Sequence, residues 1–281
     1  MSNSFAPFSP RLTTGIADSH SGQVPQSPFV SHLLTTFIAL MVVAFAPLAA
    51  AAPVLKYKVI ETQDHDPQLF TQGLIVSGDT IIESSGLYQK SLVRVYNAST
   101  GQIIANQSLS PEIFAEGITR LDDALYLLTW RAGILFVLDA NTLRTRKTKR
   151  YRGEGWGITH NGEAFFTTDG SNTITQRSLD TFKPEQTLAV VHNGQPLDRL
   201  NELEFADGAL WANRWQTPYI YRINPANGTV TGELDLTDLI APEQSHSMQE
   251  VLNGIAYDPV RKAYWVTGKY WDTRYLIEIK D

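Results

Sequence analysis

A short element recurs five times along this chain, at intervals of 40 to 52 residues. Each copy places a polar or aromatic residue before a glycine or glutamate, and an aliphatic residue follows. The copies are Gln72-Gly73-Leu74, Glu116-Gly117-Ile118, Trp156-Gly157-Ile158, Asn201-Glu202-Leu203 and Asn253-Gly254-Ile255. Self-similarity at such a period indicates repeat units that each bury a face against the next unit. The repeat therefore restricts the fold more than any other feature of the sequence.

A strand-like run follows every copy and is rich in β-branched and aromatic residues, as in Thr80–Glu83 and Ala263–Thr267. A further run often ends at a turn of Asn, Asp, Pro or Gly, as Leu92–Tyr96 does before Asn97. Helical periodicity is nearly absent, and Leu234–Ile240 could form a short helical turn at most. Several short strands in each 45-residue unit are typical of a β-propeller blade.

The five copies predict an all-β fold, a five-bladed β-propeller. Lys56–Thr62 precedes the first copy and reads as a strand, and Tyr275–Lys280 ends the last copy. We expect these two segments to pair, so that the amino-terminal strand completes the final blade and hides two sheet edges. A β-sandwich would also contain many short strands, but it does not predict the recurrence.

The composition of the 281 residues excludes several functions. There is no cysteine, which rules out disulfides, thiolate zinc sites and a cysteine nucleophile. The formal net charge is −6 without a basic tract, so we expect no nucleic-acid partner. Four histidines are scattered without the spacing of zinc ligands, namely His65, His160, His192 and His246.

The first fifty residues have a different character from the rest. Residues 33–52 carry no charge, and their apolar centre is Phe37–Phe45. Small residues follow Pro47 in the pattern that signal peptidases cut. We therefore predict a signal peptide and leader at residues 1–52 and a single catalytic propeller domain at residues 53–281. The mature protein would be periplasmic or secreted, with no stable membrane insertion after cleavage; a retained membrane anchor is the alternative.

In a propeller, the residue that opens each innermost strand lies at one end of the central channel. The recurring element would therefore gather a ring of polar and aromatic side chains there, from Gln72, Glu116, Trp156, Asn201 with Glu202, and Asn253. The glycines alone could have a structural role, because they let crowded backbones approach each other. The copies differ in their first residue, however, and this favours a binding site. Further aromatic residues follow downstream at Trp130, Trp215, Tyr270 and Trp271.

Eight segments resemble the plant and bacterial glutaminyl-peptide cyclotransferases, in the order of that family and over about residues 57–280. The segments are Phe70–Leu74, Phe114–Thr119, Leu128–Trp130, Gly153–Ile158, Leu200–Glu204, Ala212–Trp215, Val251–Ala256 and Val266–Trp271. The resemblance implies a five-bladed propeller that cyclises the amino-terminal glutamine of peptides and proteins to pyroglutamate and releases ammonia. We expect a monomer, and the cyclisation chemistry requires neither a metal nor an organic cofactor.

The resemblance also assigns roles to particular residues. It implies that Glu116 is the acid/base carboxylate. It implies that the substrate-binding walls are aromatic and that the polar contacts come from three further side chains. The walls fall on Phe70, Trp130, Trp156 and Trp215, and the polar contacts fall on Gln72, Asn201 and Lys269.

The chemistry of cyclisation suits these residue types. The substrate's α-amine attacks its own side-chain amide, and one carboxylate can take a proton from the amine and deliver it to the leaving nitrogen. Gln72, Asn201 or Lys269 could donate to the oxyanion, and the sequence does not rank them. Glu154 competes with Glu116 for the acid/base role, but its glycine-rich turn predicts exposure.

Two other classes of protein fit parts of the pattern. A non-catalytic peptide- or sugar-binding propeller would use the same aromatic residues but would have no need for Glu116. A metal-dependent propeller hydrolase would need a ring of oxygen ligands. Trp156 makes the predicted ring too apolar for a hard cation, so we expect no metal site.

Overall fold

The computed structural model describes residues 51–241 and 249–280. The chain divides into two compact units, Met1–Pro47 and Leu48–Asp281, and the following account concerns the second. The predicted signal peptide and leader lie outside the described residues except for their last two positions. Within the described ranges, none of the helical structure is long and apolar enough to cross a membrane.

The described residues form an all-β structure with one short 3₁₀ helix, η1 (Thr237–Leu239). The strands are β1 (Val54–Asp64), β2 (Thr71–Ser77), β3 (Thr80–Ser85), β4 (Leu92–Asn97), β5 (Ile103–Ser108), β6 (Ala115–Leu121), β7 (Ala124–Thr129), β8 (Ile134–Asp139), β9 (Thr145–Arg150), β10 (Ile158–His160), β11 (Ala164–Thr167), β12 (Thr173–Ser178), β13 (Pro184–Ala189), β14 (Val191–His192), β15 (Gln195–Pro196), β16 (Leu200–Ala206), β17 (Ala209–Arg214), β18 (Tyr219–Ile223), β19 (Val230–Asp235), β20 (Leu252–Asp258), β21 (Ala263–Gly268) and β22 (Thr273–Lys280).

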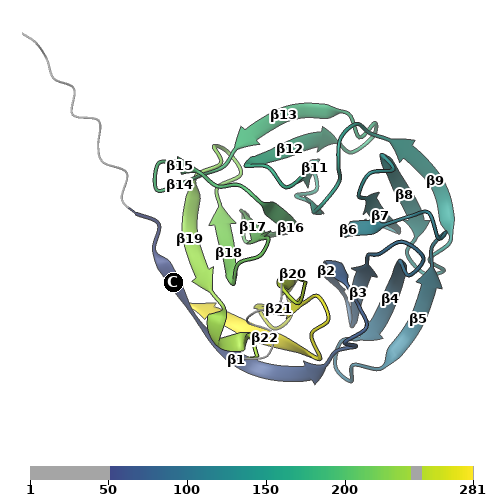
Figure 1. The fold of residues 1–281 in the computed structure, drawn as a ribbon, viewed down its shortest axis with the longest axis horizontal. Coiled ribbons are helices and arrows are strands. Elements are labelled where there is room, and N and C mark those ends of the chain that lie inside the picture. The colour runs from purple at the N-terminus through teal and green to yellow at the C-terminus, as the bar shows by residue number, and fades with distance from the viewer. Residues whose placement is uncertain (1–50, 242–248, 281) are drawn as a thin grey trace, which may run out of the picture. The chain divides into compact units, whose positions relative to one another are not determined.

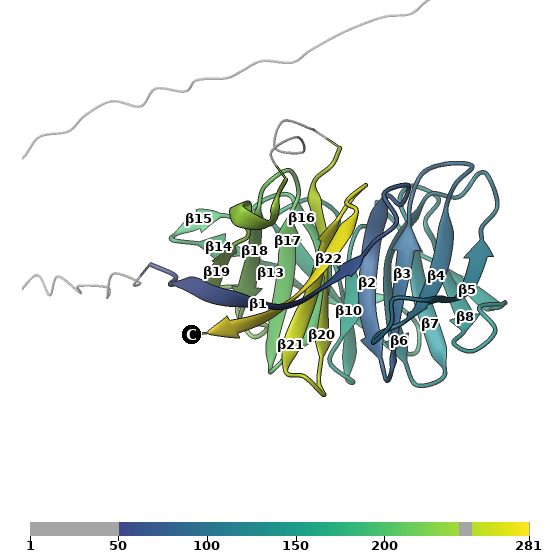
Figure 2. The same ribbon diagram turned by 90° about the horizontal axis from the view of Figure 1, so that it is seen from below.

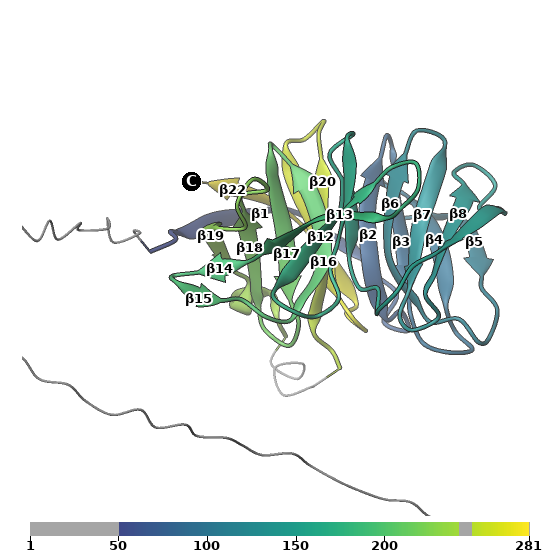
Figure 3. The same ribbon diagram turned by 90° about the horizontal axis from the view of Figure 1, so that it is seen from above.

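The strands are arranged as in a propeller. Three four-stranded sheets follow the chain order β2-β3-β4-β5, β6-β7-β8-β9 and β10-β11-β12-β13, and an eight-stranded sheet has the order β16-β17-β18-β19-β1-β22-β21-β20. In the four-stranded sheets the first strand lies toward the middle and the last strand lies at the rim (Figure 1). In the eight-stranded sheet both end strands, β16 and β20, lie toward the middle, and β19 and β1 lie at the rim. Seen from the side, the sheets stand next to one another (Figure 2), and the β14–β15 hairpin projects from the rim (Figure 3).

Strand β1 closes the ring of sheets. It pairs antiparallel with β22 from Lys56 opposite Lys280 to Asp64 opposite Thr273. Its first residues also pair in parallel with β19, at Val54 and Leu55. The pairing of the amino-terminal and carboxy-terminal strands that the sequence predicts is therefore confirmed. The same strand protects an edge of β19, because it supplies that strand with a hydrogen-bonded neighbour.

The glycine of the recurring element lets neighbouring inner strands approach closely. A Cβ atom on Gly73 would lie 2.6 Å from the backbone nitrogen of Ile118, and one on Gly117 would lie 2.6 Å from the carbonyl oxygen of Trp156. A Cβ on Gly157 would lie 2.2 Å from the carbonyl oxygen of Asn201. Only glycine fits at these contacts. The structural role considered for the repeated glycine is thus real, and it sets the spacing of the strands around the centre.

A bulge accompanies the element in four of its five copies. Strands β2, β6, β16 and β20 each carry one extra residue relative to the neighbouring strand at this point. In β6, for example, Ala115 pairs with Thr129 but Ile118 pairs with Leu127. A bulge breaks the alternation of side chains and turns an additional residue toward one end of the sheet. This local irregularity explains why Gln72, Glu116 and Asn201 can leave the sheet face and point toward a common space.

Candidate active site

A cavity of about 310 Å³ lies at the end of the molecule where the inner strands begin. Its walls are mainly aromatic, with a few polar side chains among them, which is the usual composition of a small-molecule site. The lining residues are Phe70, Gln72, Leu87, Phe114, Glu116, Trp130, Trp156, Asn201, Trp215, Gln249 and Lys269. All eight residues that the sequence analysis proposed for the site therefore line one cavity.

The structure adds three lining residues that the sequence analysis did not propose. Phe114 belongs to the same segment as Glu116, and its ring packs edge-on against Phe70 and tilted against Trp130. Leu87 lies in the β3–β4 loop with a positive φ of 84°, and no sequence pattern marks it. Gln249 comes from the loop before β20. The position of Phe114 beside the catalytic candidate was the one signal that could have identified it.

Four residues expected at the site do not line the cavity. Glu202 is buried, and its carboxyl oxygens accept hydrogen bonds from the backbone nitrogens of Leu74 and Ile255. Asn253 is fully buried, and its amide nitrogen donates to the carbonyl oxygen of Thr71 and to Oε1 of Gln72. Trp271 is also buried, and its indole nitrogen donates to the carbonyl oxygen of Glu250. Tyr270 packs edge-on against the outer side of Phe70, at 5.3 Å between ring centroids. These residues support the walls, because Asn253 holds Gln72 and the Thr71 carbonyl oxygen, and Tyr270 packs on Phe70. The Oδ1 of Asn253 has no hydrogen-bond partner in the described part of the chain.

Glu116 is 4% exposed and lies at the bottom of the cavity on β6. Its Oε1 accepts a hydrogen bond of 3.2 Å from Nε2 of Gln72, whose own Oε1 accepts from Asn253. Burial raises the pKa of Glu116 well above its ordinary value; the charge of Lys269 opposes this shift and the charge of Glu154 adds to it. A carboxyl group with a raised pKa can both take up and release a proton near neutral pH.

Lys269 is the cation of the cavity. Its Nζ lies 4.3 Å above the ring of Phe70, which places the ammonium over an aromatic face. The side chain is 4% exposed, and burial lowers the pKa of Lys269 to about 8, while the Glu116 carboxylate partly counteracts that effect. Among the described residues the Nζ makes no hydrogen bond. Its donors are therefore directed to whatever the cavity holds.

The second polar group of the cavity that lacks a protein partner belongs to Asn201. Its side chain is 1% exposed, and its Oδ1 has no hydrogen bond within the described part of the chain. A buried amide oxygen without a partner is costly, so such an atom is usually satisfied by a ligand or by water. Gln72, in contrast, is occupied by Glu116 and Asn253. The cavity thus presents the amide of Asn201 and the ammonium of Lys269 to a bound molecule.

The aromatic walls are in contact with one another. Trp156 and Trp215 meet edge to face at 5.6 Å between ring centroids, with planes at 88°. On the opposite side Phe114 connects Phe70 at 6.1 Å to Trp130 at 5.3 Å. Edge-to-face contacts hold aromatic rings at defined angles. The walls can therefore confine a short flexible side chain to few conformations.

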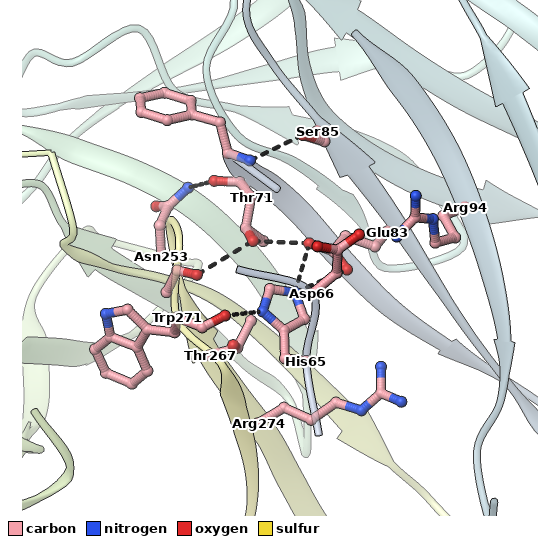
Figure 4. Close-up of polar contacts among 12 residues, drawn as sticks. His65, Asp66, Thr71, Glu83, Ser85, Arg94, Asn253, Thr267, Trp271 and Arg274 are labelled. Carbon is pink, nitrogen blue, oxygen red and sulfur yellow. Dashed lines mark hydrogen bonds and ion pairs between the residues drawn. The ribbon is translucent and has the colours of Figure 1, made fainter. Parts of the chain in front are cut away.

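A second polar cluster lies behind the cavity, around the buried residues His65 and Glu83 (Figure 4). The Nδ1 of His65 donates to the carbonyl oxygen of Trp271 at 2.6 Å, and its Nε2 lies 3.0 Å from Oε1 of Glu83. Both ring nitrogens face acceptors, so the ring carries both protons and a positive charge. Thr71 donates to Oε1 of Glu83 at 2.7 Å, and Tyr96 donates to Oε2 at 3.1 Å.

This His65–Glu83 cluster fixes the backbone beside the cavity. It holds Thr71, the residue before Gln72, and the carbonyl oxygen of Trp271, two residues after Lys269. Thr71 Oγ1 also lies 3.3 Å from the carbonyl oxygen of Gly268. The cluster therefore joins the strand that carries Gln72 to the turn that carries Lys269. The sequence analysis missed this pair, because a histidine and a glutamate 18 residues apart give no recognisable motif.

The side chains of the cavity are suited to acid/base chemistry on an uncharged part of a substrate. It contains one carboxyl group with a raised pKa, one ammonium with a lowered pKa and one free amide. Among residues 51–241 and 249–280, no three His, Asp or Glu side chains are grouped in a way that could hold a metal ion. Such a set can move a proton between two nitrogen atoms and donate hydrogen bonds to a developing oxyanion.

Comparison with known proteins gives a consistent result. The model of a protein family described as glutamine cyclotransferase matches residues 32–279. A glutaminyl-peptide cyclotransferase of Arabidopsis thaliana is 36% identical over 227 residues, which cover 79% of this chain and 71% of the relative. The crystal structure of Myxococcus xanthus glutaminyl cyclase matches with a TM-score of 0.75 and 33% identity, over 81% of this chain and 98% of that one.

Proposed function

This chain belongs to the glutamine cyclotransferase family, and on that premise we propose that it converts the amino-terminal glutamine of peptides and proteins to pyroglutamate and releases ammonia. One observation carries the proposal. A single carboxyl group of the cavity, that of Glu116, lies buried among aromatic rings, and the described residues supply it with one hydrogen bond and no ion pair. This environment leaves the carboxyl group available for proton transfer with a substrate.

The substrate's α-ammonium has an ordinary pKa of about 7.7–8.0, and burial raises the pKa of Glu116, which makes the carboxylate a stronger base toward this ammonium. Glu116 takes one proton from this nitrogen. The lone pair that becomes free forms the bond to the side-chain amide carbon, and the carbonyl electrons move onto the oxygen. A five-membered ring with a tetrahedral carbon results. The proton that moved to Glu116 stays within the closed site, ready for the second step.

Collapse of the tetrahedral intermediate breaks the bond between carbon and the amide nitrogen. Glu116 returns its proton to that nitrogen, which leaves as ammonia. The ring nitrogen loses one more proton, to Glu116 and then to solvent, and becomes the lactam N–H. We assign stabilisation of the oxyanion to the ammonium of Lys269, which has no hydrogen-bond partner among the described residues, whereas Gln72 is engaged with Glu116 and orients it. The unpartnered Oδ1 of Asn201 is an acceptor, and we assign to it an N–H group of the substrate.

The rings of the walls contribute by restricting the substrate. Cyclisation requires the glutamine side chain to bend back on its own amine, and a free chain rarely adopts this conformation. A cavity of about 310 Å³ closed by Phe70, Trp130, Trp156 and Trp215 admits one such side chain. Pre-ordering of two groups within one molecule produces effective molarities of up to about 10⁵–10⁸ M. The rest of the bound peptide extends out through the open side of the cavity, so the identity of the residues after the glutamine should have little effect on which peptides are substrates.

We also propose five blades for the fold. The eight-stranded sheet divides at β1 into β16–β19 and β20–β22, and β1 completes the latter group as its outermost strand. Together with the three four-stranded sheets, this gives one blade for each copy of the recurring element. We further propose that residues 1–52 direct export and are removed, so that residues 53–281 act as a monomer in the periplasm or outside the cell.

The test is direct. Purified protein is mixed with a dipeptide that begins with glutamine, and ammonia and the mass of the peptide are followed. We expect release of one ammonia for each peptide, and no reaction of the same peptide with an acetylated α-amine. Treatment with EDTA should leave the rate unchanged. Binding of the peptide without turnover would instead favour a non-catalytic binding propeller, and loss of activity with EDTA would favour a metal-dependent enzyme.

A further inference from the structure

The loop between β9 and β10 places a second carboxylate at the edge of the cavity. Oε2 of Glu154 accepts hydrogen bonds from two indole nitrogens, at 2.7 Å from Nε1 of Trp130 and at 3.0 Å from Nε1 of Trp156. Both indoles line the cavity, and they come from different parts of the chain. One oxygen atom therefore connects two of the walls.

The other oxygen of this carboxylate has its own partner. The Nε of Arg131 donates to Oε1 of Glu154 at 2.8 Å, and the guanidinium of Arg131 lies 3.8 Å above the ring of Trp130. The indole of Trp130 is thus held at its nitrogen by the carboxylate and on its face by the cation that pairs with that carboxylate. Glu154, Arg131 and Trp130 each contact the other two, so these three side chains hold one another in position.

Glu154 remains ionised in this arrangement. Burial alone would raise the pKa of Glu154, but hydrogen bonds from Trp156, Arg131 and Trp130 hold it below its ordinary value. Three N–H donors occupy its two oxygens. A carboxylate in this state is a poor proton carrier, which removes Glu154 as a competitor of Glu116 and leaves it a different role.

The backbone of the loop does not depend on the Glu154 side chain. The backbone nitrogen of Gly155 donates to the carbonyl oxygen of Trp130 at 3.0 Å, and the nitrogen of Tyr151 donates to the carbonyl oxygen of Gly133 at 3.0 Å. The hydroxyl of Tyr151 also bonds to the backbone of Thr129. These contacts dock the loop on the β7–β8 turn. Replacement of Glu154 should therefore release the indoles and leave the loop in place.

We propose that Glu154 is a positioning residue, which fixes the indoles of Trp130 and Trp156 at the separation and tilt that the substrate's glutamine side chain requires. This inference rests on the proposed function, because it concerns the walls of the same cavity. Sites need supporting residues behind those that touch the ligand, since a loosely held wall confers little selectivity. Arg131 belongs to the same support, because it neutralises Glu154 and covers Trp130.

Steady-state kinetics of Glu154→Ala and Glu154→Gln test the inference, with Glu163→Ala as the matched control. Glu163 is exposed in the turn between β10 and β11 and contacts no part of the cavity. Because the released indoles would confine the glutamine side chain less, we expect Glu154→Ala to raise KM for a glutaminyl peptide by about tenfold or more, with a smaller change in kcat. Glu154→Gln should recover part of the loss, because its amide oxygen can still accept from both indoles.

A double-mutant cycle separates the indole contact from other effects. Trp130→Phe keeps an aromatic wall but removes the N–H that Glu154 binds, so Glu154→Ala should raise KM less in that background. An equal effect in both backgrounds would overturn the proposal. A fall in kcat at constant KM would also overturn it, since that result would mean that Glu154 acts on the chemistry and not on the walls.

The near-ultraviolet circular dichroism of the ligand-free protein provides a readout that does not need activity. Two indoles held at a fixed mutual angle give a strong tryptophan signal, which Glu154→Ala should weaken while the far-ultraviolet spectrum stays unchanged. An unaltered tryptophan signal would count against the positioning role even if the enzyme turns over. If the wild type releases no ammonia from any glutaminyl peptide, the proposed function fails, and this spectrum still decides the inference about Glu154.

Discussion

Two buried glutamates on adjacent sheets have opposite electrostatic environments. Glu83 on β3 is 0% exposed and Glu116 on β6 is 4% exposed, so burial hardly distinguishes them. Glu83 receives hydrogen bonds from His65, Thr71 and Tyr96, whereas Glu116 receives one from Gln72. Burial alone would raise the pKa of Glu83, but the imidazolium of His65 and these donors lower it, whereas burial raises that of Glu116. The positive charge of His65 together with the additional donors, and not the degree of burial, sets the difference.

The comparison shows that one strand can serve a glutamate with a structural role and a glutamate with a role in the chemistry. Successive residues of β2 serve the two sites, since Thr71 donates to Glu83 and Gln72 donates to Glu116. The Glu83 site is saturated, so it can only hold the backbone in place. Glu116 receives a single side-chain hydrogen bond from the described residues and has no ion pair, so its pKa stays raised, which suits it to exchange a proton with an ammonium group.

The largest effect should come from Glu116→Gln. The amide keeps the hydrogen bond to Gln72 and the shape of the cavity but cannot carry a proton, so we expect kcat to fall by about 10²–10⁴-fold. Binding of a glutaminyl peptide, measured by calorimetry, should persist. Ammonia release gives the rate. A rate near that of the wild type would assign the proton transfer to another group.

Glu83→Gln should instead affect folding. The substitution leaves the His65 imidazolium buried without its counter-ion, and breaking a buried pair in this way costs about 3–5 kcal/mol. Urea denaturation measures the loss in the free energy of unfolding. His65→Gln should have a similar cost, and the double substitution should cost less than the two single changes together. A loss below about 1 kcal/mol would place the pair among those that contribute little.

The inner strands could be predicted from the sequence because they consist mainly of apolar residues. Runs such as Ala124–Trp130 and Ala263–Thr267 are buried on both faces and correspond to β7 and β21. The outermost strands gave no such signal. Strand β9 consists of Thr145–Arg150 with largely exposed, charged side chains, and its position depends on pairing with β8. Exposure removes the alternation from which strands are predicted.

Most of the residues that line the site could be predicted from the sequence, but the residues that hold those side chains in position could not. All the proposed residues line one cavity. Gln72, Glu116, Trp156 and Asn201 belong to the recurring element that the fold brings together, whereas Phe70 and Lys269 could be assigned only through the resemblance to a family. Asn253 has the same motif position as Gln72, yet it turns inward and supports Gln72. The bulges that redirect side chains in β2 and β6 leave no trace in composition. The contact of Glu154 with two indoles also depends on loop geometry that periodicity does not encode.

The pH dependence of stability gives a moderate effect that distinguishes the two glutamates. The folded-state pKa of His65 is above its ordinary 6.5, because the charge of Glu83 outweighs burial and Arg274, and that of Glu83 is below its ordinary 4.5. The contribution of the pair is therefore complete between about pH 4.5 and 6.5. It is lost as the pH rises through the folded pKa of His65 or falls through that of Glu83. Urea titrations of the wild type and the His65→Gln variant across this range should differ most inside the window. A difference independent of pH would show that the pair is not ionised.

The smallest expected effect is a gain in stability from Glu116→Gln. The folded-state pKa of Glu116 lies above its ordinary 4.5, so the folded protein binds more protons than the unfolded chain between that value and the raised one. Stability of the wild type thus falls as the pH rises through this interval, and the glutamine variant lacks this loss. We expect the variant to be more stable at neutral pH by about 0.5–2 kcal/mol, the usual gain when a functional group is neutralised, and to match the wild type below pH 4.5. Glu83→Gln, measured in parallel, should change the free energy of unfolding in the opposite direction. If both substitutions destabilise the protein equally at neutral pH, then the two carboxyl groups are equally well solvated and Glu116 has no special reactivity.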